Sequence, residues 1–226
     1  QHPLLGVRYV QSTRQLGAPD VVILPGTKNT VEDLLWLRQC GLEAAVLKLA
    51  ASGTPVLGGC GGYQMLGQTL ADPQGLESGR AQTVRGLGLL PTHTVFTDKK
   101  HRTQDTAVVT APQLAGAALT GYQIHTGRTT VQGAPFCRLA DGSAEGCVQG
   151  STAGTYLHGL FDTGELTEKL VHLLCSRKGI SPAAAPLRSM QEYRQQQFDL
   201  LADGVRRALD MDALYAAMDL ERRTAP

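Results

Sequence analysis

The first third of the chain alternates short apolar runs with longer segments whose apolar side chains recur at helical spacing. Strands and amphipathic segments in this order indicate a parallel sheet covered by helices. The run at 20–24 is continuously apolar after its aspartate, which is typical of a strand buried on both faces. The expected strands are 7–10, 20–24 and 55–57, and the expected helices run from a capping box at Thr30 to an interruption at Gly41, from 42 to 51 and from 63 to 70.

The middle of the chain, residues 86–148, has a different pattern. Short β-rich pieces are separated there by Gly, Pro and Asp, which predicts hairpins attached to the main sheet. The pieces are 87–90, 106–109, 122–124, 136–139 and 147–148.

The last third returns to strands and helices. A strand at 155–157 ends at His158, and a helix is expected at 166–177. Ser181 and Pro182 are expected to cap a final helical region, which closes with a short helix at 212–218. Its apolar stripe, which we assign to core or interdomain packing, consists of Phe198, Leu201, Val205 and Leu209.

These patterns together predict an α/β fold. Its sheet is mostly parallel with helices on both faces, and the hairpins are added within 86–150. No internal repeat or low-complexity linker interrupts the chain, so we expect a single domain spanning 1–226.

The composition excludes several classes of function. The net charge is +1, so no field of one sign favours a nucleic acid or an anionic membrane as partner. No run of about 18 apolar residues predicts a membrane span. The five cysteines are odd in number and form no C-x-x-C pair, which argues against a disulfide framework or a metal site and for a reduced, cytoplasmic setting.

One cysteine, Cys60, is flanked by two glycines on each side, because residues 56–66 read V-L-G-G-C-G-G-Y-Q-M-L. Gly58, Cys60 and Gly62 fit G-x-C-x-G, a sharp strand-to-helix turn in which a Cβ at the flanking positions would clash. The sulfur would then lie at a helix N-terminus, which favours the thiolate, and the Gly61 N–H would point at a tetrahedral oxyanion. The alternative is a glycine-rich turn with an idle cysteine.

A thiolate nucleophile needs an acid and base, and His158 is the best candidate. It ends a predicted strand, and the carboxyl ends of parallel strands line the same crevice of a sheet. His125 also follows a short β-rich piece and is the rival base.

Five stretches resemble the glutamine amidotransferase domain of the cobyric acid synthase family, within the class I, triad-type glutamine amidotransferases. The resemblance implies their flavodoxin-like fold. The stretches are 24–38, 58–67, 86–91, 121–129 and 154–162.

The resemblance also implies roles. Cys60 would attack the side-chain amide of glutamine, and His158 would protonate the leaving ammonia and then activate water. Gly61 and Gly26 resemble an oxyanion hole. Gln64 and Arg102 match positions that contact substrate glutamine in relatives, although Arg102 also reads as a solvated loop charge.

Triad-type glutamine amidotransferases usually carry a glutamate two residues after the histidine, whereas Leu160 stands here, in a Gly-Leu-Phe type of sequence that cobyric acid synthases and their cell-wall relatives share. Asp162, another group or none would then orient His158. His125 and Arg128 belong to a family motif and would order the site or face a partner domain.

The resemblance implies an upstream synthetase domain that uses ATP and Mg²⁺ to activate corrinoid carboxylates. No phosphate-binding loop occurs here, so we expect a fragment without its own cofactor or metal. Three alternatives stay open: a glutaminase subunit for cell-wall precursors, a catalytically silent docking or regulatory module, and a cysteine peptidase.

Overall fold

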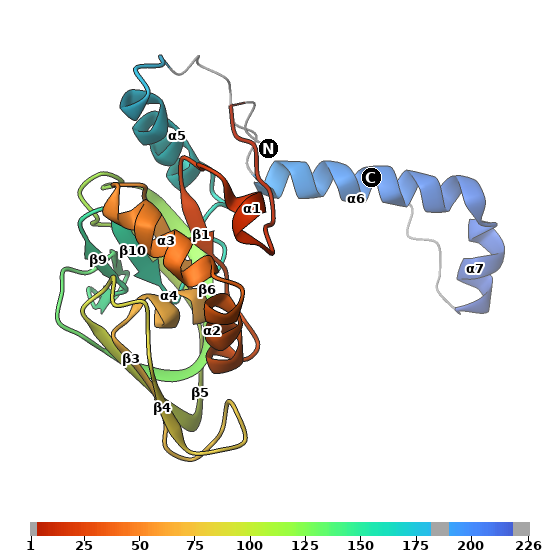
Figure 1. Ribbon diagram of the computed structural model, residues 1–226. Coiled ribbons are helices and arrows are strands. Elements are labelled where there is room, and N and C mark those ends of the chain that lie inside the picture. The colour runs from red at the N-terminus through yellow and green to blue at the C-terminus, as the bar shows by residue number, and fades with distance from the viewer. Residues whose placement is uncertain (1–3, 182–189, 219–226) are drawn as a thin grey trace. The chain divides into compact units, whose positions relative to one another are not determined.

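The computed structural model describes residues 4–181 and 190–218, and its contacts divide the chain into two compact units, 1–187 and 188–226 (Figure 1). The first unit carries both sheets and the candidate site. The single domain expected from the sequence stays a prediction.

The first sheet is mostly parallel, as predicted. Its order is β1-β2-β10-β9; β1, β2 and β10 run parallel, and β9 pairs antiparallel with β10. β1 lies at the edge of the sheet, where Ile23 is 44% exposed, so the prediction of burial on both faces is wrong. The strands are β1 (Val22–Leu24), β2 (Val56–Gly59), β9 (Cys147–Gln149) and β10 (Thr152–Thr155).

The helices at 30–39, 42–51 and 165–177 begin and end close to the predicted positions, whereas the short helix at 13–16 was not predicted. The N-cap of the second helix is Asn29, whose side chain accepts the Glu32 N–H, and not Thr30. Residues 7–10 form no strand. The helices are α1 (Thr13–Leu16), α2 (Thr30–Gln39), α3 (Leu42–Ala51), α4 (Gly61–Leu66) and α5 (Glu165–Arg177).

The hairpin region forms a second sheet of its own. Its order is β4-β3-β5-β7-β8, with β6 paired to β5 in a long antiparallel hairpin. The two sheets meet at isolated bridges, one of which joins Tyr122 to His158. The strands are β3 (Thr69–Asp72), β4 (Gln82–Arg85), β5 (Thr92–Val109), β6 (Ala118–Val131), β7 (Cys137–Leu139) and β8 (Ala144–Glu145).

Two predictions around α4 are wrong for a common reason. The helix ends at Leu66 instead of residue 70, and 87–90 is a loop instead of a strand. That loop satisfies the end of the helix, because Leu87 N donates to the Met65 carbonyl and Leu90 N to the Leu66 carbonyl. Leu90 is also fully buried, so its apolar pattern reflects packing rather than a strand.

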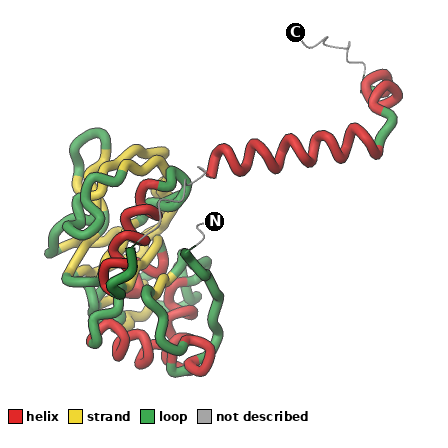
Figure 2. The backbone as a smooth tube through the Cα atoms, turned by 90° about the horizontal axis from the view of Figure 1, so that it is seen from above, coloured by secondary structure: helices red, strands yellow, loops and turns green. Residues whose placement is uncertain are grey.

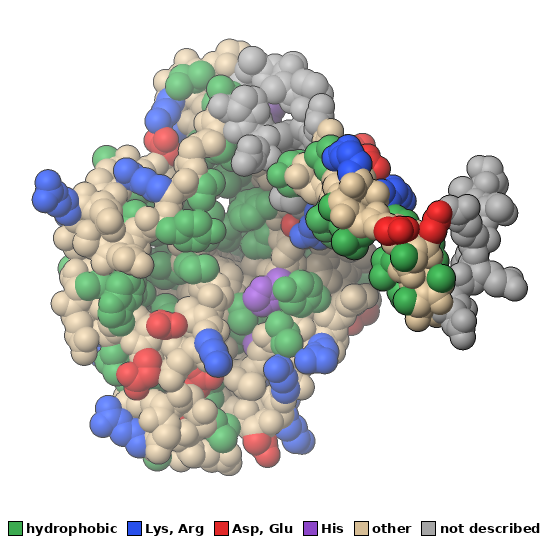
Figure 3. Space-filling view, turned by 90° about the vertical axis from the view of Figure 1, so that its right-hand side faces the viewer, with side chains coloured by type: hydrophobic (Ala, Val, Ile, Leu, Met, Phe, Trp, Pro, Cys, Tyr) green, Lys and Arg blue, Asp and Glu red, His purple; other side chains and the backbone are tan. Residues whose placement is uncertain are grey.

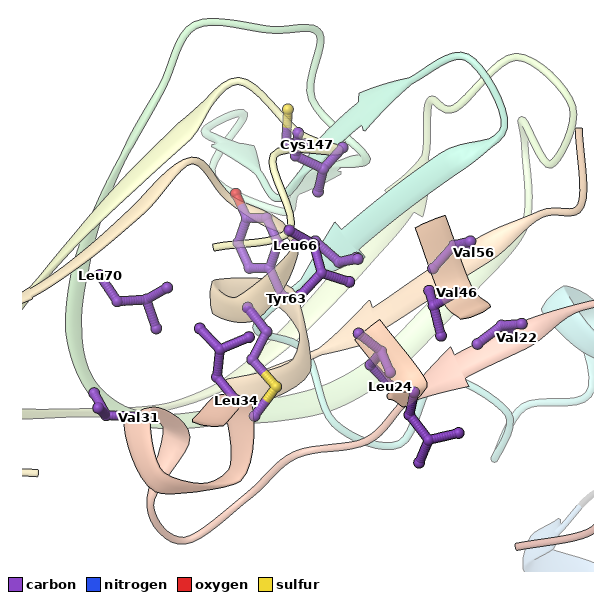
Figure 4. Close-up of a cluster of buried hydrophobic side chains, with 14 of the residues drawn as sticks. Val22, Leu24, Val31, Leu34, Val46, Val56, Tyr63, Leu66, Leu70 and Cys147 are labelled. Carbon is purple, nitrogen blue, oxygen red and sulfur yellow. The ribbon is translucent and has the colours of Figure 1, made fainter. Parts of the chain in front are cut away.

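The core consists of two clusters on opposite faces of the first sheet. Val56 belongs to the cluster beneath α2, α3 and α4, whereas its neighbour Leu57 packs with Leu166 of α5. Successive strand residues point to opposite faces, which explains this division. Figure 4 shows the first cluster, in which Leu34, Val46 and Leu66 of the helices surround strand residues.

The second unit contains α6 (Met190–Ala208) and α7 (Met211–Ala217), and Figure 2 shows α6 as one long helix. Phe198 and Leu201 of the apolar stripe are 61% and 63% exposed, so the stripe is not a core within this unit. Ser181 precedes this unit, and Pro182, the other residue of the predicted cap, lies outside the described residues. None of the described helices combines the length and apolar character needed to cross a membrane.

Candidate active site

The carboxyl ends of the three parallel strands β1, β2 and β10 lie at one edge of the first sheet. A Cβ built on Gly26, just after β1, would lie 3.4 Å from both Cys60 Cβ and His158 Cε1. These two atoms therefore lie within twice that distance of each other, although the residues are far apart in the sequence. The predicted meeting of Cys60 and His158 at one sheet edge is therefore confirmed. Figure 3 shows one face of the molecule, where histidine side chains reach the surface with lysine and arginine nearby.

The turn at Cys60 has the backbone that its glycines predict. Cys60 has φ 50° and ψ −110°, and it is the only non-glycine residue with positive φ among those the structure describes. A Cβ on Gly58 would lie 2.8 Å from the Gly62 carbonyl oxygen, and a Cβ on Gly62 would lie 2.1 Å from the Leu24 carbonyl oxygen. The glycines allow β1, β2 and α4 to pack at backbone contact around the sulfur.

The electrostatics of Cys60 differ from the prediction. Burial raises the pKa of its thiol, the Gly61 N–H lowers it by less, and Glu77 raises it further. The helix that follows is short, and its start does not offset the lost hydration. The thiol is therefore the favoured form, and its Sγ lies 3.6 Å from the Ile124 carbonyl oxygen of β6 as a weak donor.

His158 is held by Tyr122. Their rings stack with centroids 4.9 Å apart and planes at 8°. In addition, the backbone N–H of His158 donates to the backbone carbonyl of Tyr122 at 2.8 Å. Burial lowers the pKa of His158, which favours neutral imidazole. Its Nε2 is buried and has no hydrogen-bond partner among the described residues, so it is placed to accept a proton. Tyr122 was missed as a site residue, although it lies within a stretch singled out in the sequence.

The residue that would carry the family's usual carboxylate is part of the core. Leu160 is 9% exposed and packs with Leu157 and Leu166. Asp162 follows in a turn in which its N–H donates to the Gly159 carbonyl at 2.9 Å. Its predicted role in orienting His158 stays a prediction.

The predicted oxyanion hole lies where the loop after β1 meets the start of α4. A Cβ on Gly61 would lie 2.7 Å from Thr27 Oγ1 and 3.1 Å from Thr27 N, so the two backbones are in contact there. Gly26 precedes this contact and lies between the two candidate catalytic residues. Thr27 Oγ1 is buried and has no hydrogen-bond partner among the described residues, a polar atom that sequence reasoning missed.

Gln64 lies beneath the site and is 3% exposed. Its Oε1 accepts from Thr30 Oγ1 at 2.9 Å, and its Nε2 donates to the Tyr156 hydroxyl at 3.1 Å. Both ends of the amide therefore have protein partners. Direct contact of Gln64 with a substrate stays a prediction.

His125 is a support rather than an open base in this arrangement. Its ring stacks on Tyr156 with centroids 3.6 Å apart, and its Nδ1 lies 2.9 Å from the Gly127 carbonyl oxygen. Burial lowers the pKa of His125 to about 4, which keeps it neutral. Arg128, from the same motif, is exposed on β6 opposite Val95.

The glycines of this motif have a structural reason. A Cβ on Gly121 would lie 2.0 Å from the His158 carbonyl oxygen, and a Cβ on Gly127 would lie 2.5 Å from Gln64 Nε2. The motif therefore brings β6 into contact with the segment that carries His158.

Arg102 lines a hollow on the hairpin formed by β5 and β6. It is exposed on β5 opposite Ile124, and the two residues share with Tyr122 the wall of a cavity of about 440 Å³. The Ile124 carbonyl contacts Cys60, and the Tyr122 ring contacts His158. Neither Cys60 nor His158 lines the hollow itself, and a cation at its wall can bind a carboxylate.

Metal-ligating side chains do not gather at this edge. Within 4–181 and 190–218, no group of three or more His, Cys, Asp or Glu side chains could hold a metal ion.

Comparison with known proteins agrees with this geometry. The model of the CobB/CobQ-like glutamine amidotransferase domain family matches residues 1–166. Relatives named cobyric acid synthase are 41% identical in Moorella thermoacetica and 42% identical in Citrobacter koseri, over 96% and 97% of this chain. A crystal structure titled as a glutamine amidotransferase shares the fold with a TM-score of 0.52 at 19% identity, covering 78% of this chain and 88% of that one.

The matches cover only part of the relatives. The chain spans 44% of the Moorella relative and 45% of the Citrobacter relative, less than half of each. The PurLQS structure from Thermotoga maritima also has a TM-score of 0.52, at 15% identity over 76% of this chain and 85% of that chain. The family match and these relatives together show that the chain belongs to the CobB/CobQ-like glutamine amidotransferase domain family.

Proposed function

We propose that Cys60 and His158 carry out glutamine hydrolysis in this domain and release ammonia. The observation that supports this most is their approach around Gly26, with a buried and unpartnered His158 Nε2. The sulfur is a nucleophile only as thiolate, so a nearby base must take its proton.

The two pKa shifts define the starting state. Both groups begin neutral, because burial raises the pKa of the Cys60 thiol and lowers that of His158. His158 takes the thiol proton as the sulfur attacks the side-chain carbonyl carbon of glutamine. The carbon–nitrogen bond then breaks, the leaving nitrogen takes that proton, and ammonia leaves a glutamyl thioester on Cys60.

Water completes the cycle. His158 takes a proton from water as its oxygen attacks the thioester carbon. The carbon–sulfur bond breaks, the thiol regains the proton, and glutamate leaves. Gly61 and Gly26 donate backbone N–H groups to the oxyanion of both tetrahedral intermediates, where removal of one donor typically costs about 10²–10³ in rate.

Arg102 is proposed to bind the α-carboxylate of glutamine. Arg102 lines the same hollow as Tyr122 and Ile124, which in turn contact the two reacting residues. Gln64 would support this pocket from below through Thr30 and Tyr156.

For the whole protein we propose the activity named by the relatives, that of a cobyric acid synthase. An ATP- and Mg²⁺-dependent synthetase domain would activate corrinoid side-chain carboxylates, and ammonia from this domain would convert them to amides. We place this enzyme in the cytoplasm. The similarity to cobyric acid synthases over nearly the whole chain supports this choice over a cell-wall amidotransferase.

The proposal is tested by glutaminase assays on wild type, Cys60→Ala and His158→Ala. Cys40→Ala is the matched control, because Cys40 lies at the end of α2. Ammonia release should fall to background in the first variant and persist in the control. Equal release by wild type and Cys60→Ala would overturn the proposal.

One observation favours a second candidate, a silent docking or regulatory module. The position two residues after the histidine, where triad-type enzymes usually carry a glutamate, is Leu160, and its side chain is buried in the core. A domain that binds a synthetase but never forms a thioester, even in the presence of that synthetase, would show that this candidate is correct.

A further inference from the structure

A buried carboxylate outside the predicted site contacts the segment that carries His158. Glu145 on β8 is 7% exposed, and burial raises its pKa above the usual 4.5. Three donors surround it: the Thr155 hydroxyl, the Tyr156 N–H at 2.7 Å and the Cys137 thiol at 3.4 Å. A buried carboxylate is costly unless it is hydrogen-bonded, so these contacts fix its place.

The Glu145 carboxylate takes the place of a backbone partner that β9 does not provide for the residue after β10. β9 pairs with β10 from Gln149 opposite Thr152 to Cys147 opposite Gly154. Continued register would place Glu145 opposite Tyr156, but Gly146, at φ 70°, breaks the ladder. A Cβ on Gly146 would lie 2.4 Å from the Gly154 carbonyl oxygen, so the chain turns sharply there. The Glu145 side chain then accepts the Tyr156 N–H, which has no ladder partner.

The same segment contacts Cys60 and continues along the chain into His158. The Thr155 carbonyl accepts the Cys60 N–H at 2.8 Å, and Thr155 Oγ1 accepts the Leu157 N–H at 3.1 Å. His158 follows directly. Movement of Thr155 would therefore displace the nucleophile turn and the histidine together.

We propose that Glu145 is a positioning residue, which sets the placement of Cys60 relative to His158 by holding Thr155 and Tyr156. It touches neither reacting group. This inference rests on the proposed glutamine hydrolysis for its kinetic test and on Cys60 alkylation for a test without glutamine.

The kinetic test uses the 226-residue chain with Glu145→Ala, Glu145→Gln, Thr155→Val and the Glu145→Ala/Thr155→Val double variant. A displacement of about 1 Å at reacting groups can cost about 10²-fold, so Glu145→Ala should lower kcat by about that factor, with KM nearly unchanged. Glu145→Gln keeps an acceptor for the Tyr156 N–H and should recover most of the loss. Thr155→Val should lower kcat in wild type and have little further effect in Glu145→Ala, because the two residues act through one contact.

Val109→Ala is the control for loss of stability, because Val109 is buried in the hydrophobic cluster that also contains Cys137, a donor to Glu145. It should lower the melting temperature without changing kcat at temperatures where the chain is folded. A kcat loss in Glu145→Ala that matches Val109→Ala at equal folded fraction would overturn the proposal. Thr155→Val and Glu145→Gln provide the test if Glu145→Ala fails to fold.

Alkylation of Cys60 by iodoacetamide, followed by mass spectrometry across pH, separates this inference from the proposed function. An aligned His158 accepts the thiol proton, so misalignment should slow alkylation near pH 7 and move its profile to higher pH. We expect this shift in Glu145→Ala and Thr155→Val but not in Val109→Ala. An unchanged profile in both would refute the positioning role, whether or not the wild type hydrolyses glutamine.

Discussion

The imidazole of His158 lies flat against the phenol ring of Tyr122, with centroids 4.9 Å apart and planes at 8°. In triad enzymes a carboxylate holds the histidine in its productive orientation. Here the Tyr122 ring stacks on the imidazole, and the backbones of the two residues are hydrogen-bonded. We predict that the stacked ring helps to orient His158, because Leu160 supplies no charge.

This relationship makes Tyr122 sensitive to loss of its ring but not of its hydroxyl. A stacked aromatic pair contributes about 0.5–1.5 kcal/mol, so Tyr122→Ala should lower kcat by about 2- to 10-fold. Tyr122→Phe keeps the stack and should retain near wild-type kcat. Steady-state glutaminase assays check both variants, and equal activity of Tyr122→Ala and Tyr122→Phe would show that the ring does not orient His158.

Arg102 should act on substrate binding rather than on chemistry. A hydrogen bond to a charged group contributes about 1.5–3 kcal/mol, so Arg102→Ala should raise KM for glutamine by about 10- to 100-fold with a smaller effect on kcat. Lys100→Ala is the matched control, because Lys100 is an exposed cation on the same strand. Similar KM values for the two variants would assign Arg102 to the solvated surface.

The glycines around Cys60 should differ sharply in tolerance. A Cβ on Gly62 would lie 2.1 Å from the Leu24 carbonyl oxygen, whereas a Cβ on Gly59 would meet nothing within 4 Å. Overpacking of this kind costs about 3 kcal/mol, so Gly62→Ala should lower Tm by about 10 °C while Gly59→Ala leaves it nearly unchanged. Thermal unfolding followed by circular dichroism measures both. A stable Gly62→Ala would contradict the backbone contact between β1 and α4.

His125 should make stability depend on pH below neutrality. Its folded pKa of about 4 lies below its usual 6.5, so the unfolded chain binds the proton more readily. The stability contributed by neutral His125 is present above pH 6.5 and is lost as the pH falls from 6.5 toward 4. The lowered pKa of His158 acts in the same direction, and His101 faces His125 with centroids 5.1 Å apart.

Urea unfolding at pH 7 and pH 5 checks this dependence. His125→Phe keeps a ring against Tyr156 and should reduce the stability lost between the two values. His172→Gln, an exposed histidine on α5, is the control and should leave the loss unchanged. An identical loss of stability between pH 7 and pH 5 in wild type and His125→Phe would show that His125 is not buried in its neutral form.

Much of the first sheet and its site could be predicted because the signals are local. The apolar run before Gly26 and the glycines around Cys60 specify short strands and one sharp turn. His158 follows the third parallel strand, and the carboxyl ends of such strands meet at one edge. Sequence order alone therefore predicted that Cys60 and His158 meet.

The remaining features depend on contacts between distant segments. Leu87 and Leu90 look like strand residues, but their N–H groups bond to carbonyls at the end of α4. Tyr122 stacks on His158 only because the second sheet approaches the first. Glu145 reads as an ordinary charge in a hairpin, and only the broken ladder at Gly146 directs it inward.

The pKa of Cys60 shows a similar dependence on context. The position at a helix start predicted a lowered value, but burial raises it by more than the Gly61 N–H lowers it. Desolvation depends on every segment packed around the sulfur, including Ile124 of the second sheet. A local motif therefore predicted the sharp turn at Cys60 but not the protonation state of its thiol.

The most direct test of the central claim is covalent labelling by the glutamine analogue 6-diazo-5-oxo-L-norleucine, located by peptide mass spectrometry. If Cys60 and His158 form the glutamine-hydrolysing pair, the label attaches to Cys60, glutamine protects against it, and His158→Ala slows it strongly. Label on another cysteine, or attachment to Cys60 at the same rate in His158→Ala and without protection by glutamine, would contradict the account.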